Sequence, residues 1–330
     1  IKSFAAEFEK PVADKHFSLD VIDTYKKKKK KQNKKAKDEF EDVQYTDGNK
    51  EAEAMMGVSL VEGKYGKAAY FDDEYDFLEL QKTGLYELNE PFSIGLWVKT
   101  TREGLGPTQT IAGNSGNYAS DYRGWDLYLD SSMHIRGRLI HRLPDEYIEV
   151  VSAETFAPNT WQHVGMTYDG TAKASGLHLY LDGKSLDLTT EMDDLSRSIY
   201  PVDDFTFKRD TTALVVGRSN RAWTFDVGLL EGAVDEIDIF NRELTALEMG
   251  LLGERTDPFS KEEKKEYHVA KNSDFKKKRQ EFLRAQTSRR EVLDTVQEIM
   301  VMEEMAQPRK TYLLERGLYN KKGEVVEAGT

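Results

Sequence analysis

Residues 159–170, Asn-Thr-Trp-Gln-His-Val-Gly-Met-Thr-Tyr-Asp-Gly, and residues 177–184, Leu-His-Leu-Tyr-Leu-Asp-Gly-Lys, decide the fold. In each run an apolar residue recurs at every second position, which is the period of a strand with one buried face. Each run ends in Asp-Gly, and this pair favours a turn because Gly adopts positive φ without steric cost and Asp tolerates it. The two runs therefore predict neighbouring strands of a β-sandwich, and the second continues as a hairpin into residues 185–188.

Other stretches show the same alternation. In residues 92–99, Phe-Ser-Ile-Gly-Leu-Trp-Val-Lys, the apolar residues at even positions should face the space between two sheets, which puts Trp97 on the other face. We predict further strands on both sides of this one in the sequence, at residues 63–72, 77–80, 110–113, 124–130, 133–140, 214–218 and 232–242.

These stretches, in this order, resemble the laminin-G-like, concanavalin A-like jelly-roll family. The resemblance covers about residues 57–253, and the motifs that show it are Gly63-Lys64-Tyr65-Gly66-Lys67-Ala68-Ala69-Tyr70-Phe71-Asp72, the strand at 92–99, Trp161-Gln162-His163-Val164, Thr167-Tyr168-Asp169-Gly170, Leu179-Tyr180-Leu181-Asp182-Gly183-Lys184 and Gly232-Ala233-Val234-Asp235-Glu236-Ile237. The resemblance implies a mainly β fold, a concanavalin A-like β-sandwich jelly roll. The sequence outside it adds flanking α-helical hairpin segments to this expectation.

The flanking segments predict helices. Residues 18–43 are polar, with apolar residues at helical spacing and Ser18 as N-cap, and predict one helix. Thr245 with Glu248, and Ser260 with Glu263, have the spacing of capping boxes and predict two more. Residues 273–299 predict a longer helix with a short coiled-coil seam. We expect the first and last of these helices to pair, with the jelly roll as an insertion.

The seam of the longest helix follows steps of three and four residues and is interrupted by Lys278 and Arg289. Its apolar members are Phe275, Phe282, Ala285, Val292, Val296 and Ile299.

Residues 299–330 resemble the opening of the C-terminal domain of large multidomain proteins of planctomycetes and related bacteria, in which a cytochrome-c-like module is associated with family-specific domains. This resemblance implies a fragment of an envelope-located bacterial protein, periplasmic or extracellular, with no haem in this fragment. The domain organisation that we expect is an N-terminal helical or linker segment ending a preceding domain (1–56), the jelly roll (57–254), a helical segment (255–298) and the start of a truncated C-terminal domain (299–330).

Composition limits the possible partners. The chain of 330 residues has no cysteine, so it contains no disulfide and no thiolate metal site. No run of about 18 apolar residues predicts a transmembrane segment. The net charge is −12, and residues 57–254 contribute 17 basic against 33 acidic residues, or −16. Because an acidic surface repels phosphate groups, we predict no nucleic acid as partner of the sandwich. We interpret the lysine run at 26–37 as a solvated face.

Two carboxylates on one predicted strand, Glu236 and Asp238, raise the possibility of a glycosidase, since jelly-roll glycosidases place their catalytic carboxylates on one face of a strand. A retaining enzyme needs a second carboxyl group about 5 Å away across the sugar. Asn241 stands where the family's last Glu would be. We therefore predict no catalytic residues and a chain that is not an enzyme.

A calcium site is a further hypothesis. Asp72 and Asp73 follow the opening strand and Asp235 precedes the end of the closing strand, and first and last strands of such a fold often lie side by side. Carboxylate oxygens suit Ca²⁺. The same aspartates could instead cap turns.

The sequence favours a noncatalytic carbohydrate-binding or interaction module with a polysaccharide or glycan as partner, besides the neighbouring domains of the same chain. Aromatic faces stack on sugar rings, and polar neighbours bind hydroxyl groups. The candidate ligand-binding residues are Trp97, Tyr118, Tyr122, His163, His178, Tyr180 and Trp223. A structural spacer without ligand and, less favoured, a glycosidase using Glu236 and Asp238 are the alternatives.

Overall fold

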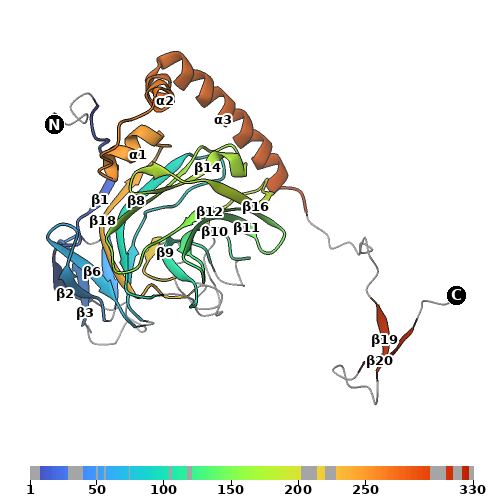
Figure 1. Cartoon of the computed structure of the whole chain (residues 1–330), viewed down its shortest axis with the longest axis horizontal. Helices are drawn as coiled ribbons and strands as arrows, with labels where there is room; N and C mark the ends of the chain where they lie inside the picture. Colours follow the sequence, from blue (N-terminus) through green and yellow to red (C-terminus); the bar gives the residue numbers. More distant parts are fainter. Residues whose placement is uncertain are drawn as a thin grey trace, which may run out of the picture. The chain divides into compact units, whose positions relative to one another are not determined.

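The computed structural model describes residues 8–28, 40–49, 51–55, 57–73, 75–103, 106–116, 121–201, 214–219, 228–297, 310–314 and 322–326. It contains two compact units, residues 1–294 and 295–330. The first unit holds two large antiparallel sheets and three α-helices (Figure 1).

The first sheet, called sheet A, has eight strands. Its order is β15-β14-β13-β8-β18-β6-β5, with β1 also paired to β18. The strands are β1 (Lys15–Phe17), β5 (Ser59–Glu62), β6 (Lys67–Phe71), β8 (Phe92–Thr100), β13 (Gln162–Tyr168), β14 (Leu177–Leu181), β15 (Lys184–Ser185) and β18 (Gly232–Phe240).

The second sheet, called sheet B, has ten strands in the order β16-β12-β11-β10-β9-β17-β7-β4-β3-β2. They are β2 (Ile22–Lys28), β3 (Phe40–Thr46), β4 (Ala52–Met55), β7 (Phe77–Leu80), β9 (Gln109–Gly113), β10 (Gly124–Leu129), β11 (His134–Arg142), β12 (Glu146–Thr155), β16 (Leu188–Asp194) and β17 (Leu214–Val216). A 3₁₀ turn, Ala174–Gly176, precedes β14.

One hydrophobic core fills the space between the sheets. In β8 the even positions Phe92, Ile94, Leu96 and Val98 belong to this core, as predicted, while Trp97 lies on the other face. β13 and β14 contribute their alternate residues in the same way. The β-sandwich that the alternation predicted is therefore confirmed.

The last strand of the sandwich, β18, lies in the middle of sheet A. One of its edges pairs with β8, and the other pairs first with β6 and then with β1. In the pairing with β8 the register shifts at a β-bulge between Asp235 and Asp238, where Glu236 has a φ of 51°. The expected neighbourhood of opening and closing strands is thus confirmed.

Helix α1 (Ala246–Leu252) covers the outer face of sheet A (Figure 1). Its predicted capping box is present, with Thr245 accepting a hydrogen bond from the backbone of Glu248. The helix approaches the strands closely because Gly95 and Gly165, which are register partners on β8 and β13, present no side chain there. A Cβ at Gly165 would lie 2.3 Å from Cε of Met249.

Helices α2 (Lys261–Lys271) and α3 (Ser273–Asp294) form the predicted C-terminal helical segment. The capping box of Ser260 with Glu263 is present at the start of α2. The partner of α3 within the unit is α2 rather than an N-terminal helix, so the expected pairing of the chain's first and last helices is wrong.

The helix predicted over residues 18–43 is also wrong where the structure describes it, because β2 and β3 form an antiparallel pair at the edge of sheet B. The middle of this range, residues 29–39, lies outside the described residues. The apolar residues of this segment have helical spacing, but pairing at the edge of the sheet decides its structure instead. Phe17 lies in the main core, and Phe8 contacts the ring of Tyr267 edge-on at 5.2 Å. These two residues therefore pack within this unit, and the preceding domain stays a prediction.

The second unit contains a short hairpin of β19 (Thr311–Leu314) and β20 (Lys322–Val326). Most of the residues whose sequence resembles multidomain planctomycete proteins lie outside the described residues. That context stays a prediction. No helix among the described residues is both long and apolar enough to span a membrane.

The turn after β14 offers a test of the packing of α1. Asp182 and Gly183 have φ values of 49° and 71°, and a Cβ at Gly183 would lie 2.8 Å from Cα of Gly250. We expect Gly183→Ala to lower the free energy of unfolding by about 2 kcal/mol, through backbone strain and the clash with α1. Urea unfolding measures this change.

Lys184→Ala is the matched control for this turn. It removes only an exposed ion pair with Asp257, so we expect a change below about 1 kcal/mol. Equal effects of the two substitutions would contradict the packing argument.

Candidate functional site

Trp97, His163 and Tyr180, three of the predicted ligand-binding residues, all lie on the outer face of sheet A and are covered. Their exposed fractions are 6%, 2% and 4%. The ring of His163 lies edge-on to Trp97, and Nζ of Lys64 lies 3.9 Å from the centroid of a Trp97 ring. Tyr180 belongs to a small apolar cluster with residues of α1. In this arrangement none of the three presents a free ring face to a sugar.

Burial also fixes the charge state of His163. Desolvation, with the positive charges of Lys10 and Lys64, lowers the pKa of this imidazole to about 3. His163 is therefore neutral at physiological pH and packs as part of the layer beneath α1.

The other predicted ligand-binding residues do not form one site either. His178 is half-buried on β14, next to Tyr180 along the strand. Tyr122 is half-buried at the start of β10, with a φ of 62°, and belongs to the opposite sheet. Tyr118 and Trp223 lie outside the described residues.

The three aspartates of the calcium hypothesis are separated by the strand register. Gly232 pairs with Phe71 and Val234 with Ala69, so Asp72 and Asp235 leave opposite ends of the paired segment. Asp72 and Asp73 lie in a turn in which both backbone amides donate to Asp76. Among the described residues no three His, Asp or Glu side chains are arranged to hold a metal. Calcium binding thus stays a prediction without a common set of ligands.

Asp235 nevertheless has an unusual environment. Its side chain is fully buried, and Oδ2 accepts a hydrogen bond of 2.9 Å from the backbone N–H of Tyr65, whereas Oδ1 has no hydrogen-bond partner in the part of the chain that the structure describes. Burial, reinforced by the neighbouring Glu236 carboxylate, raises the pKa of Asp235 to about 6. This carboxylate ties the β5–β6 turn to the bulge in β18.

The possible catalytic pair, Glu236 and Asp238, is bridged by a histidine. His16 on β1 places Nε2 3.4 Å from Glu236 and Nδ1 2.8 Å from Asp238. The prediction from sequence alone missed this contact, because His16 lies more than 200 residues away in the predicted helical segment. Both carboxylates thus have a structural partner on the neighbouring strand.

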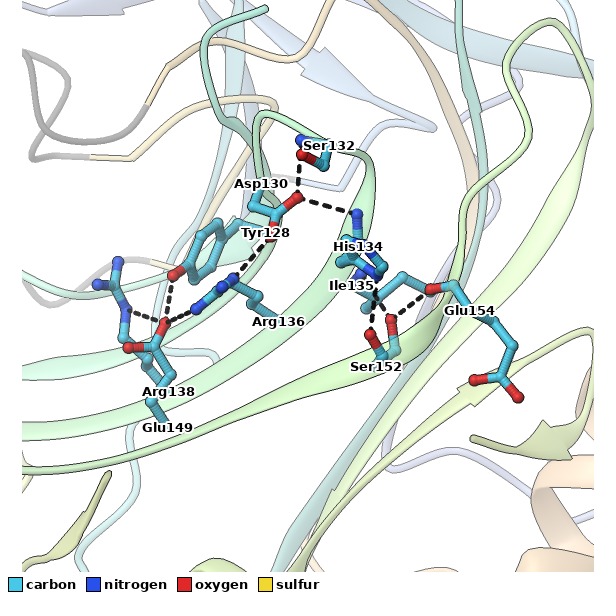
Figure 2. A network of polar contacts seen from close by, with 10 residues as sticks. All are labelled: Tyr128, Asp130, Ser132, His134, Ile135, Arg136, Arg138, Glu149, Ser152 and Glu154. Atoms are coloured by element: carbon cyan, nitrogen blue, oxygen red, sulfur yellow. Dashed lines mark hydrogen bonds and ion pairs between the residues drawn. The ribbon is translucent and has the colours of Figure 1, made fainter. Parts of the chain in front are cut away.

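The outer face of sheet B carries a different cluster, which the sequence analysis did not identify. Strand pairing places Asp126 opposite Arg138 and Arg138 opposite Glu149, and places Tyr128 opposite Arg136. Figure 2 shows the side chains of Tyr128, Arg136, Arg138 and Glu149 close together on β10, β11 and β12. Opposite charges therefore alternate across three neighbouring strands, which favours their pairing.

Glu149 is the centre of this cluster. The hydroxyl of Tyr128 donates to its Oε1, Nη1 of Arg136 lies 3.3 Å from the same oxygen, and Nε of Arg138 lies 3.9 Å from it. The guanidinium of Arg138 also lies 4.5 Å from the centroid of the Tyr128 ring. Burial and the Glu149 carboxylate raise the pKa of Tyr128, so its hydroxyl stays protonated and donates.

Asp130 closes the cluster at the β10–β11 turn. It accepts hydrogen bonds from Nε of Arg136 at 2.9 Å and from the backbone amides of Ser132 and His134 (Figure 2). Burial alone would raise the pKa of Asp130, but these donors outweigh it and the pKa is lowered. Asp130 therefore remains a carboxylate that holds Arg136 in place.

Two polar atoms of the cluster are not engaged within it. Among the described residues, Nη2 of Arg136 and Oε2 of Glu149 have no hydrogen-bond partner, although the other polar atoms of both side chains are engaged. The Arg136 side chain is 23% exposed, and Glu149 is 9% exposed. Polar residues alternating with core residues on β10 and β11 are the sequence signal that could have shown this face.

The chain belongs to the concanavalin A-like lectin/glucanases superfamily. A laminin-G-type family model with this description matches residues 72–249, which is more than half of the 330 residues. The predicted resemblance to this family is confirmed. Comparison with curated protein sequences gives no match.

Several solved structures are similar. The binding domain of Paraclostridial Mosquitocidal Protein 1 has 18% identity and a TM-score of 0.45, with 64% of this chain and 49% of that chain covered. Domain 4 of AbnA, an extracellular arabinanase from Geobacillus stearothermophilus solved with arabinotriose, has 19% identity and a TM-score of 0.42, covering 60% and 82%.

The CBM40 domain of the Ruminococcus gnavus IT-sialidase, bound to α2,3-sialyllactose, has 14% identity and a TM-score of 0.39, covering 50% of this chain and 82% of that chain. The present chain spans about half the length of the first of these proteins.

The raised pKa of Asp235 predicts a pH dependence in the absence of metal. An unfolded Asp titrates near 3.9, so between about pH 4 and pH 6 the folded protein holds a proton that the unfolded chain lacks. The contribution of Asp235 to the free energy of unfolding therefore falls as the pH rises through this window. We therefore expect the free energy of unfolding of Asp235→Asn, compared with that of the native chain, to be more favourable at pH 7 than at pH 4.

Urea unfolding in EDTA at four pH values measures this, with the exposed Asp187→Asn as the control. A stability difference between Asp235→Asn and the native chain that is the same at pH 4 and at pH 7 would contradict the expectation.

Proposed function

We propose that this chain is a noncatalytic carbohydrate-binding module whose site is the cluster on the outer face of sheet B. The observation that supports the proposal is the pair of unengaged groups, Nη2 of Arg136 and Oε2 of Glu149, held by a network of hydrogen bonds on three neighbouring strands. Vicinal sugar hydroxyls need one donor and one acceptor at close range, and a rigid sheet keeps both in position.

A saccharide rather than an ion suits this arrangement. The cluster contains both charge signs, so neither an anion nor a cation would be favoured by its overall field. A neutral polyhydroxy ligand exchanges hydrogen bonds with both kinds of group. The localisation that we infer is outside the cytoplasm, where polysaccharides occur, and the glycosidase alternative has no support from the His16-bridged carboxylates.

Arg136→Ala tests the site, and Arg142→Ala is its matched control. Both arginines lie on β11 and both form an ion pair with an aspartate, but Arg142 pairs with Asp145 outside the cluster. In a panel of soluble polysaccharides, followed by calorimetry on each binder, we expect Arg136→Ala to weaken affinity at least about tenfold, the effect of losing one charged hydrogen bond. Arg142→Ala should leave affinity unchanged.

Three outcomes would contradict the proposal. Binding that survives Arg136→Ala but disappears in a folded Trp97→Ala variant would move the site to sheet A. Hydrolysis of a bound glycan that is lost in Glu236→Gln would make the chain a glycosidase. The absence of binding to the whole panel would favour the spacer.

A further inference from the structure

Helix α3 attaches to the sandwich mainly through polar side chains. Arg279 forms an ion pair with Glu243 and donates to the backbone carbonyl of Asp169 at 2.9 Å. Three turns further on, Arg290 lies 2.8 Å from Glu87. Leu283 lies between these ion pairs and would be 3.0 Å from a Cβ at Gly170. One face of α3 is therefore committed to the sandwich.

A neighbouring face of the same helix is apolar and exposed. Phe275, Phe282 and Val292 are 41%, 47% and 65% exposed. Together with Ala285 they follow the heptad spacing of a helix–helix seam. At 100° per residue this stripe is centred roughly 100° from the residues that contact the sandwich. The position of α3 on the sandwich thus leaves the seam open.

The seam continues into a cleft between α2, α3 and the part of the sandwich that contains Asp169 and Glu243. The cleft has a volume of about 410 Å³, and its apolar lining comes from Val269 and Ala270 of α2 and from Phe275, Phe282 and Leu283 of α3. Val269 is itself 38% exposed. Exposed apolar side chains that line a groove at helical spacing are the recognition surface for an amphipathic helix.

Charge identifies the kind of helix that fits. The seam is interrupted by Lys278 and Arg289, and α3 as a whole has seven basic against four acidic residues. Lys278 pairs with Glu281, but this pair is exposed and therefore weak. A second copy of α3 does not fit, because its own seam positions hold the same cations and no carboxylate. The cleft itself is lined by three carboxylates, those of Asp169, Glu243 and Glu266, of which Glu243 pairs with Arg279, so the cations that select a partner are the two on the seam.

We propose that the open seam of α3 binds an acidic amphipathic helix of another polypeptide segment, with apolar residues at heptad spacing and carboxylates facing Lys278 and Arg289. The apolar stripe supplies affinity and the two cations select the partner, since a helix with cations at the facing positions would bury like charges. This site is distinct from the cluster on sheet B, so the two can bind at the same time.

Two synthetic helices test the proposal on the full chain. Both have leucine at the seam positions; the first has glutamate at the two positions facing Lys278 and Arg289, and the second has lysine there. Fluorescence anisotropy should show at least tenfold tighter binding of the glutamate peptide. Phe282→Asp should reduce that binding at least tenfold, whereas Val12→Asp, at a 91% exposed valine elsewhere, should not.

The charge-reversed chain provides the decisive comparison. Lys278→Glu combined with Arg289→Glu should invert the preference, so that the lysine peptide binds more tightly; both positions are exposed, and circular dichroism checks that the helix persists. Equal binding of both peptides, or no inversion, would overturn the proposal. Self-association of the chain in sedimentation, abolished by Phe282→Asp, would overturn it in favour of a second copy as the occupant.

Discussion

The alternation of side chains about the strand pleat is the constraint on which the rest of this structure depends. Each strand can give only every second residue to the shared core, so its remaining residues are fixed on an outer face. On β8 this rule sends Ile94 and Leu96 inward and Trp97 outward. The two outer faces are therefore built from the residues that the core does not use.

The two outer faces of the sandwich differ in what lies on them. Sheet A has a pair of glycines, Gly95 and Gly165, where a helix can approach, and α1 covers that face and its aromatic residues. On sheet B the corresponding layer consists of ion-paired residues around Glu149, whose desolvation is compensated only while their partners remain in place. The aromatic outer face of sheet A is thus covered by a helix, and the candidate site lies on the polar outer face of sheet B. The sequence analysis had predicted the opposite, with the aromatic residues as the ligand-binding site.

Most strands and the superfamily could be predicted, because each depends on a local pattern such as the alternation at 162–168 or the Asp182-Gly183 turn. The N-terminal segment could not, since its residues are strands only through pairing with β4 and β18. The candidate site depends on register: Arg138 and Glu149 are unremarkable in sequence and meet only because β11 and β12 align them. Trp97 was placed on the correct face, but Lys64 and Tyr65 of the β5–β6 turn cover its ring, which alternation does not reveal.

The central position of β18 has a consequence for synthesis of the chain. β8 and β6 both need β18 as a neighbour, and β1 pairs with it across more than 200 intervening residues. Until β18 has left the ribosome, the edges of these strands and the inner face beneath Ile237 remain uncovered. Contacts of such high sequence separation make folding slow and expose strand edges to other chains. The nascent sandwich should therefore depend on chaperones until residue 240 has emerged.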